Sequence, residues 1–195
     1  MKKPKLTKAE EKKQSRQMQG NEFVLRNLAQ NPHLAPKHQA TLAKLGDIYV
    51  LYHLAQNPNL ALAAQAILAQ SSDEWVLRGL AINPNLAPKH QATLAQSKNP
   101  KVLRYLASNP ILVPEHQATL VQRRDTRVLG SLAWNPNLAP EHQATLAKSN
   151  DGYVLWNLAR NRNLAPELLT KIVKKINNKW SQKMESIHEN LKNSR

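Results

Sequence analysis

The sequence predicts an all-α protein built as a solenoid of six 26-residue helical repeats that is closed by a C-terminal helix. The first observation is that valine recurs at every twenty-sixth position, at Val24, Val50, Val76, Val102, Val128 and Val154. A period in this range is typical of solenoids, whose stacked units share one continuous core. The second is that each period holds two helix-start signals. The third is that no segment alternates apolar and polar residues over a strand length.

The first helix of each copy starts after a short polar residue that can accept hydrogen bonds from free backbone N–H groups. These expected N-caps are Asn21, Asp47, Asp73, Asn99, Asp125 and Asp151. Val, Leu, Leu and Ala then follow at helical spacing, as in the segment 76–81, and make one apolar stripe. The helix is expected to end near a recurrent asparagine that proline follows in five copies, because the residue before proline leaves the helical region.

A second, shorter helix is expected to begin at a proline suited to a first helical turn. These prolines are Pro36, Pro88, Pro114, Pro140 and Pro166, and the second copy has Leu62 instead. One copy holds too few aliphatic side chains to offset the entropy of ordering its backbone, so the copies must stack to fold.

The two ends of the chain differ from the repeats. Apolar residues recur at helical spacing from Leu168 to Leu191 with lysines between them, which predicts a basic amphipathic helix over residues 174–195. Capping the last repeat is favoured over lying on a membrane surface. Residues 1–20 offer almost no apolar face and are expected to form a basic, disordered tail. The six-repeat solenoid then covers residues 21–173.

The chain has a net charge of +15, concentrated in its ends. Residues 1–21 and 171–195 each hold seven basic and two acidic side chains. Such an excess favours polyanionic partners, either nucleic acid or an anionic membrane surface, although lysine-rich tails are also often simply solvated. Absence of cysteine excludes disulfides and cysteine-held zinc or iron–sulfur clusters. No secretory signal or membrane-spanning stretch is apparent, so a cytoplasmic protein is expected.

The recurring pattern Val-x-x-x-Leu-Ala-x-Asn-Pro-x-Leu-x-Pro, with Leu-Ala following, resembles the variant leucine-rich repeat family over residues 22 to about 173. This resemblance implies alternating α- and 3₁₀-helices stacked in a right-handed superhelix without a sheet. It implies no single activity. The chain departs from the family where leucines are common in the second helix, and the packing there stays open. The substituted pairs are His38-Gln39, His90-Gln91, His116-Gln117 and His142-Gln143.

The outward face of the first helices concentrates the variation between copies. It falls at the residue before each valine and at the second, third and sixth residues after it. These 24 positions hold eight of the nine aromatic residues and six Arg or Lys, with no Asp or Glu. We call this face the aromatic–arginine stripe, and its candidate ligand-binding residues are Tyr49, Tyr52, Trp75, Arg78, Lys101, Arg104, Tyr105, Arg127, Trp134, Tyr153, Trp156 and Arg160.

Arginines interleaved with aromatic rings suit a nucleic acid, because guanidinium groups meet phosphates and bases stack on rings. The same residues also suit a peptide or partner domain. A third interpretation places the aromatics at Phe23, Tyr49, Trp75 and Tyr153 in the core between copies.

The favoured hypothesis is a non-enzymatic scaffold that binds a polyanion, most readily nucleic acid, through the stripe and the tails. A protein-interaction scaffold is the alternative. An enzyme resembling helical-repeat DNA glycosylases is disfavoured because the stripe lacks a carboxylate. No cofactor is expected, and the histidine ladder spaces its rings too far apart for a metal cage.

Overall fold

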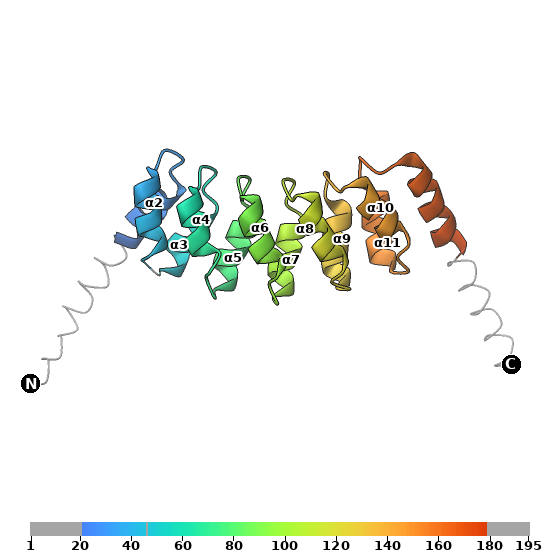
Figure 1. Cartoon of the computed structure of the whole chain (residues 1–195), viewed down its shortest axis with the longest axis horizontal. Coiled ribbons are helices and arrows are strands. Elements are labelled where there is room, and N and C mark those ends of the chain that lie inside the picture. Colours follow the sequence, from blue (N-terminus) through green and yellow to red (C-terminus); the bar gives the residue numbers. More distant parts are fainter. Residues whose placement is uncertain (1–20, 46, 179–195) are drawn as a thin grey trace, which may run out of the picture. The chain divides into compact units, whose positions relative to one another are not determined.

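The structure, a computed structural model, describes residues 21–45 and 47–178 (Figure 1). Helices joined by short turns make up this part of the chain, which contains no strand. The all-α class is therefore confirmed. The predicted N-terminal tail and residues 179–195 of the predicted capping helix lie outside the described residues. Contacts divide the chain into two compact units between His90 and Gln91, and each unit is a stack of helix pairs.

In unit 1, helices at the same phase of the repeat pack on one another. Helix α3 packs on α5, and α2 packs on α4, so first helices and second helices form two separate rows. This neighbour-to-neighbour packing is that of a helical solenoid. The unit contains the helical residues 21–30, α2 (Pro36–Ala43), α3 (Ile48–Ala55), α4 (Leu62–Leu68) and α5 (Glu74–Ala81).

Unit 2 repeats this arrangement, with α9 packed between α7 and α11, and α8 against α10. Helix α6 (Pro88–Ala95) contains the division between the units. The helices of unit 2 are α7 (Pro100–Ala107), α8 (Pro114–Val121), α9 (Thr126–Trp134), α10 (Pro140–Ala147), α11 (Gly152–Ala159) and the helical residues 166–178. The second helices are α-helical, which differs from the 3₁₀ geometry that the family resemblance implied.

The predicted N-caps are confirmed for five first helices. The Asp47 carboxylate accepts from Val50 N at 2.8 Å, and Asp73 accepts from Val76 N at 3.0 Å. Asn99, Asp125 and Asp151 act in the same way at α7, α9 and α11. The prediction is wrong for Asn21, which is itself helical.

The predicted Val-Leu-Leu-Ala stripe forms the core of the later copies. At α7, Val102, Leu106 and Ala107 are fully buried, and the equivalent residues of α3 and α9 are buried as well. The first copy differs, because Val24 is 61% exposed and Leu28 is also exposed. No preceding copy covers that face among the described residues.

A ladder of buried asparagines joins successive copies. In unit 2, Asn135 Nδ2 donates to Ala107 O at 2.7 Å and to Asn109 O at 2.8 Å, both in the preceding copy. Its Oδ1 accepts from Asn137 N at 2.8 Å, within its own turn. Asn83 repeats this pattern in unit 1, and Asn161 repeats it at the end of unit 2. The recurrent asparagine therefore links copies as well as ending a helix.

A second ladder consists of buried glutamines in the second helices, and it shows how the His-Gln pairs pack. Gln117 is fully buried, and its Nε2 donates to Leu112 O and to Asn137 O, each at 2.9 Å. Its Oε1 accepts from Ala139 N in the next copy. Gln39, Gln65 and Gln143 make equivalent bonds. The glutamine thus satisfies buried backbone groups at a position where a leucine would leave them unpaired.

Two basic side chains at one phase cap the ends of second helices. Arg123 Nη2 donates to Ala95 O at 2.7 Å, and Lys175 Nζ donates to Lys148 O and Ser149 O at 2.9 and 2.8 Å. Cations are favoured at helix C-termini, where carbonyls lack partners. Ile172, one turn before Lys175, is fully buried. The described start of the C-terminal helix is therefore fixed to unit 2.

The histidines at the recurring His-Gln phase differ in environment. His90 is buried and forms a hydrogen bond to the backbone of Leu62, and His142 Nε2 lies 3.0 Å from Pro114 O. Burial lowers the pKa of His90, and the neighbouring Lys89 charge lowers that pKa further. His90 is therefore neutral near neutral pH.

Acidification is expected to destabilise unit 1 through His90. Because the folded pKa lies below the unfolded value, the unfolded state binds more protons at mildly acidic pH. The contribution is complete above about pH 6.5 and is lost as pH falls through the lowered folded pKa. Thermal unfolding at pH 7.5 and 5.5 should show a smaller pH difference for His90→Gln than for the natural chain. An identical pH difference in both proteins would contradict this role of His90.

Candidate functional site

The aromatic side chains of the aromatic–arginine stripe lie on the surface. Tyr49 is 60% exposed, Trp75 55% and Tyr153 49%, and Phe23 is exposed too. Trp134 and Trp156 are also about half exposed. The interpretation of these rings as core between copies is therefore wrong. From α3 onward, the first helices bury the valine and the leucine four residues after it, and they present the rings outward.

Other predicted stripe residues are half-buried between neighbouring first helices, namely Tyr52, Arg78, Arg104 and Tyr105, whereas Lys101, Arg127 and Arg160 are exposed. Gly130, a stripe position in α9, leaves room for an aromatic ring of the next copy. A Cβ atom there would lie 2.2 Å from Cε1 of Tyr153. The glycine therefore lets the Tyr153 ring lie against the backbone of α9.

Carboxylates lie beside the stripe in unit 1, although none of the 24 stripe positions is itself acidic. Glu74 Oε1 lies 3.4 Å from Arg78 Nη1, and Glu22 forms an ion pair with Arg26. Each glutamate stands four residues before its arginine, a spacing that brings two side chains onto one helix face. This spacing is visible in the sequence. Both glutamates, however, stand two residues before a repeat valine, which is not a stripe position.

An aromatic pocket of about 520 Å³ lies on the stripe of unit 1, between α3 and α5. The Tyr52 and Trp75 rings meet edge to face with centroids 6.2 Å apart. Two arginine side chains stack on rings of this cluster, with Arg26 Cζ 4.4 Å from the Tyr49 centroid and Arg78 Cζ 4.4 Å from the Trp75 centroid. The pocket is lined by Ile48, Tyr49, Tyr52, His53, Asp73 and Trp75.

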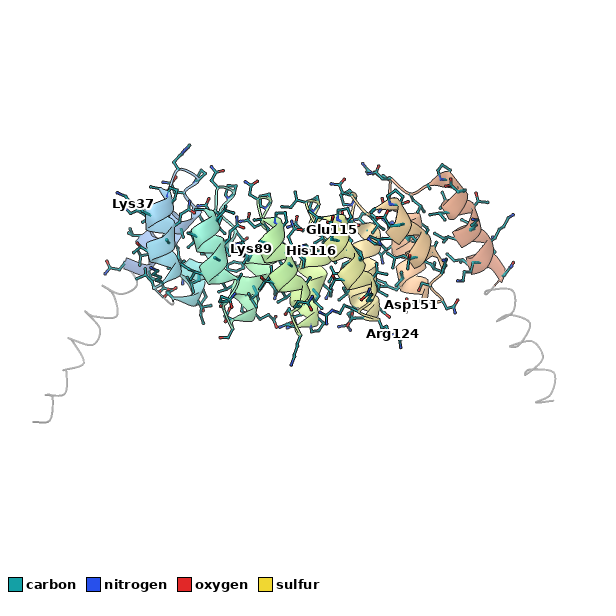
Figure 2. The ribbon with its side chains drawn as sticks, viewed as in Figure 1. Lys37, Lys89, Glu115, His116, Arg124 and Asp151 are labelled. Atoms are coloured by element: carbon teal, nitrogen blue, oxygen red, sulfur yellow. The ribbon has the colours of Figure 1, made fainter. Side chains whose placement is uncertain are left out.

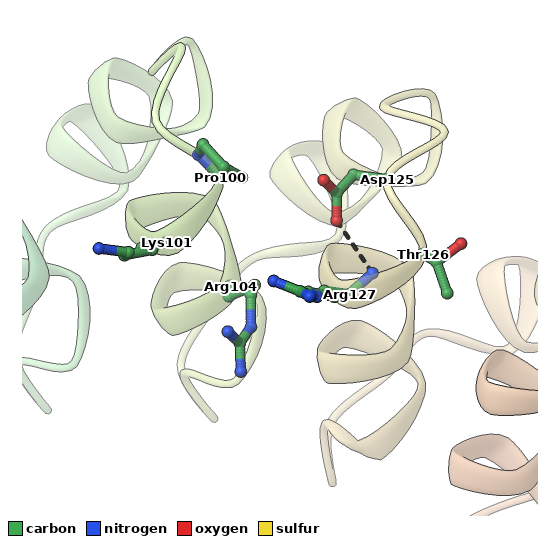
Figure 3. Close-up of a pocket in the computed structure, with 6 residues that line it drawn as sticks. All are labelled: Pro100, Lys101, Arg104, Asp125, Thr126 and Arg127. Carbon is green, nitrogen blue, oxygen red and sulfur yellow. Dashed lines mark hydrogen bonds between the residues drawn. The ribbon is translucent and has the colours of Figure 1, made fainter.

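A cationic pocket of about 250 Å³ lies on the stripe of unit 2, between α7 and α9 (Figure 3). Figure 3 shows Arg127 reaching from α9 toward Arg104 on α7, while the Lys101 side chain extends away from them. Asp125 is the acidic residue of the lining, and its Oδ1 already accepts from Arg127 N and Val128 N at 2.9 Å.

Neither Arg104 nor Arg127 forms an ion pair within the part of the chain that the structure describes. Arg104 Nε is buried and has no hydrogen-bond partner there. Arg26 Nε in unit 1 shares this state, so the buried Nε atom does not distinguish the pocket. Both Arg104 and Arg127 line the pocket, and guanidinium N–H groups donate strong hydrogen bonds to anionic oxygens. The two guanidinium groups therefore make this pocket suited to an anionic oxygen ligand.

A third pocket, of about 300 Å³, continues the stripe of unit 2 between α9 and α11. The Arg160 guanidinium lies 5.5 Å from the ring centroids of both Trp134 and Trp156. Tyr153 and Asn157 also line this pocket. Tryptophan rings from α9 and α11 therefore lie close to one guanidinium group within unit 2.

The outward face of the second helices differs from the stripe. It carries exposed side chains of both signs and no aromatic ring, as Figure 2 shows for Lys37, Lys89 and Glu115. Mixed charge without aromatic side chains is typical of a solvated surface. Among the described residues, the Phe, Tyr and Trp side chains are therefore confined to the stripe.

The fold and these surfaces define a helical repeat protein. Comparison with models of known protein families, with curated proteins and with solved structures finds no match to this chain. None of the described helices is both long and apolar enough to cross a membrane.

Proposed function

We propose that this chain is a non-enzymatic repeat scaffold that binds single-stranded or structured nucleic acid through the stripe of unit 2. The observation that carries the proposal is the pair formed by Arg104 and Arg127, which line one pocket and have no carboxylate partner among residues 21–45 and 47–178. Guanidinium groups bind phosphate oxygens with two hydrogen bonds each. The basic ends of the chain add further contacts to the same polyanion.

The exposed rings of unit 2 supply the second element of such a surface. Trp134, Tyr153 and Trp156 lie within reach of the Arg160 guanidinium, and bases stack on rings of this kind for about 1 to 3 kcal/mol each. Rigid helices hold these groups, so little entropy is lost when a strand binds.

We also infer the family of the chain and its location in the cell. The Asn-Pro and Leu-x-Pro positions support membership of the variant leucine-rich repeat family. A cytoplasmic location agrees with a nucleic-acid ligand. The chemistry of the described pockets is that of binding, with cations and rings in place of a nucleophile and its base.

A protein-interaction scaffold is the second candidate function, and the stripe of unit 1 favours it. There both Arg26 and Arg78 are paired with glutamates, so their charges are largely balanced. Exposed Tyr and Trp side chains with balanced arginines are typical of protein interfaces.

Fluorescence titration separates the two functions. Single-stranded RNA and DNA oligomers are expected to quench the tryptophan emission as bases stack on Trp134 and Trp156. Polyglutamate of equal charge should bind more weakly because it has no bases. Equal affinity for polyglutamate and the oligomers would contradict base stacking, and the absence of binding to either polymer would exclude the polyanion function.

A further inference from the structure

The aromatic pocket of unit 1 has the chemistry of a site for an organic cation. We propose that it binds a methylated ammonium group, such as the trimethylammonium group of choline or of trimethyllysine. Three electron-rich rings, those of Tyr49, Tyr52 and Trp75, share its lining with the carboxylate of Asp73. Ring faces attract cations, and quaternary ammonium groups lose little hydration on entering a site of this kind. This proposal is independent of nucleic-acid binding by unit 2.

The charges around the pocket favour a cation over an anion. Asp73 is the charged carboxylate of the lining, and the two nearby arginines are balanced by Glu22 and Glu74. The net charge of these five side chains is therefore about −1, from three carboxylates and two guanidinium groups. A phosphate would meet Asp73 without an unbalanced cation to hold it.

His53 adds no charge to the lining near neutral pH. Burial lowers its pKa, and the neighbouring Arg26 charge lowers that pKa further. Gln30 Nε2 lies 2.7 Å from His53 Nδ1, and an amide nitrogen can only donate, so Nδ1 acts as the acceptor. The ring is then neutral, and the pocket keeps its negative balance.

The chain itself shows that these rings accept cations. Arg26 stacks on Tyr49 and Arg78 on Trp75, each at 4.4 Å from the ring centroid. Neither arginine belongs to the pocket lining, so the cavity is space that they do not fill. Its volume of about 520 Å³ exceeds the size of a trimethylammonium group and leaves room for the chain that carries it.

The test compares a cation with its neutral isostere on the full-length chain. The indole N–H signal of Trp75 is followed by NMR during titration with choline and, separately, with 3,3-dimethyl-1-butanol at constant ionic strength. The signal is assigned by its loss in Trp75→Phe. Choline is expected to bind at least about tenfold more tightly than the alcohol, since the two differ in charge but hardly in shape. Equal affinities would overturn the proposal, as would tighter binding of adenosine than of choline.

Titration with a trimethyllysine peptide, compared with choline, identifies the kind of molecule that carries the methylated ammonium group. Preference for the trimethylated peptide over choline indicates a protein partner, and the reverse order indicates a small molecule or lipid head group. Either order supports the site. Failure of both the peptide and choline to shift Trp75 overturns it.

Asp73→Asn removes the charge and keeps the fold, because asparagine is an equally good N-cap and Asn99 already has this role at α7. Asp125→Asn is the matched control, since it makes the same change at the same phase in unit 2. Choline affinity should fall about tenfold in Asp73→Asn and stay unchanged in Asp125→Asn. An equal effect of both variants would contradict a local role of Asp73.

Discussion

Replacing Asn135 by alanine is expected to destabilise the chain by about 3 kcal/mol or more, because each buried polar group that loses its partner costs about 1 to 3 kcal/mol. The side chain is fully buried and makes three hydrogen bonds. Its loss leaves the carbonyl of Ala107 and the N–H of Asn137 without these bonds. It also removes one of the two bonds that Asn109 O accepts, the other coming from Leu112 N at 3.1 Å. The free energy of unfolding, measured by urea denaturation followed by circular dichroism, reports the change.

Asn137→Ala is the matched control for this prediction. Asn137 lies two residues later and is exposed, and its Nδ2 donates to Pro110 O at 2.8 Å at the surface. Water can replace that bond, so the expected cost is below about 1 kcal/mol. Asn135→Asp keeps the shape but removes the donor group, and it should be as destabilising as alanine. Similar stability of the Asn135 variants and the control would refute the ladder as a major source of stability.

Replacing Arg104 and Arg127 together by glutamine is expected to weaken nucleic-acid binding about a hundredfold. Each contact between a guanidinium group and a phosphate contributes about 1.5 kcal/mol or more, and 1.4 kcal/mol corresponds to a factor of ten. Glutamine keeps part of the aliphatic side chain, so the packing of α7 and α9 should change little. Affinity for a fluorescently labelled single-stranded oligomer, measured by anisotropy, is the readout.

The matched control removes the same charge elsewhere in unit 2. Lys148 and Arg162 are exposed and lie outside the stripe, so Lys148→Gln with Arg162→Gln lowers the net charge equally. If binding depends on the pocket, this control should lose less than about threefold, since it changes only the general field of the protein. Equal losses in the two double variants would show that net charge, rather than the stripe, determines affinity.

Much of the fold was predictable because one physical pattern repeats in the sequence. The 26-residue spacing, the N-caps such as Asp73 and the first-turn prolines such as Pro114 each specify local structure, and the structure confirms them. The roles of Asn135 and Gln117 were not predicted, because they depend on carbonyls of a neighbouring copy. A polar residue that recurs unchanged at one phase is nevertheless a signal for such a ladder.

The exposure of the stripe was predictable from the sequence, whereas the charges beside it were not predicted. The helical period places Tyr49, Trp75 and Tyr153 outward, and they are exposed. The pairing of Arg78 with Glu74 was missed, although their spacing of four residues predicts it. The grouping of side chains into separate pockets depends on how neighbouring helices stack, which the sequence of one copy does not specify.

Phosphate binding by the unit 2 stripe is tested by the salt dependence of nucleic-acid binding. Four cations of the unit 2 stripe, Lys101, Arg104, Arg127 and Arg160, would contribute about −2.8 to the slope of log K against log salt concentration on a single strand, at about 0.7 for each phosphate contact. The natural chain is therefore expected to show a slope at least this steep. The Arg104→Gln and Arg127→Gln double variant should show a slope shallower by about 1.4. A flat salt dependence, or the same slope in both proteins, would contradict phosphate binding by this pocket.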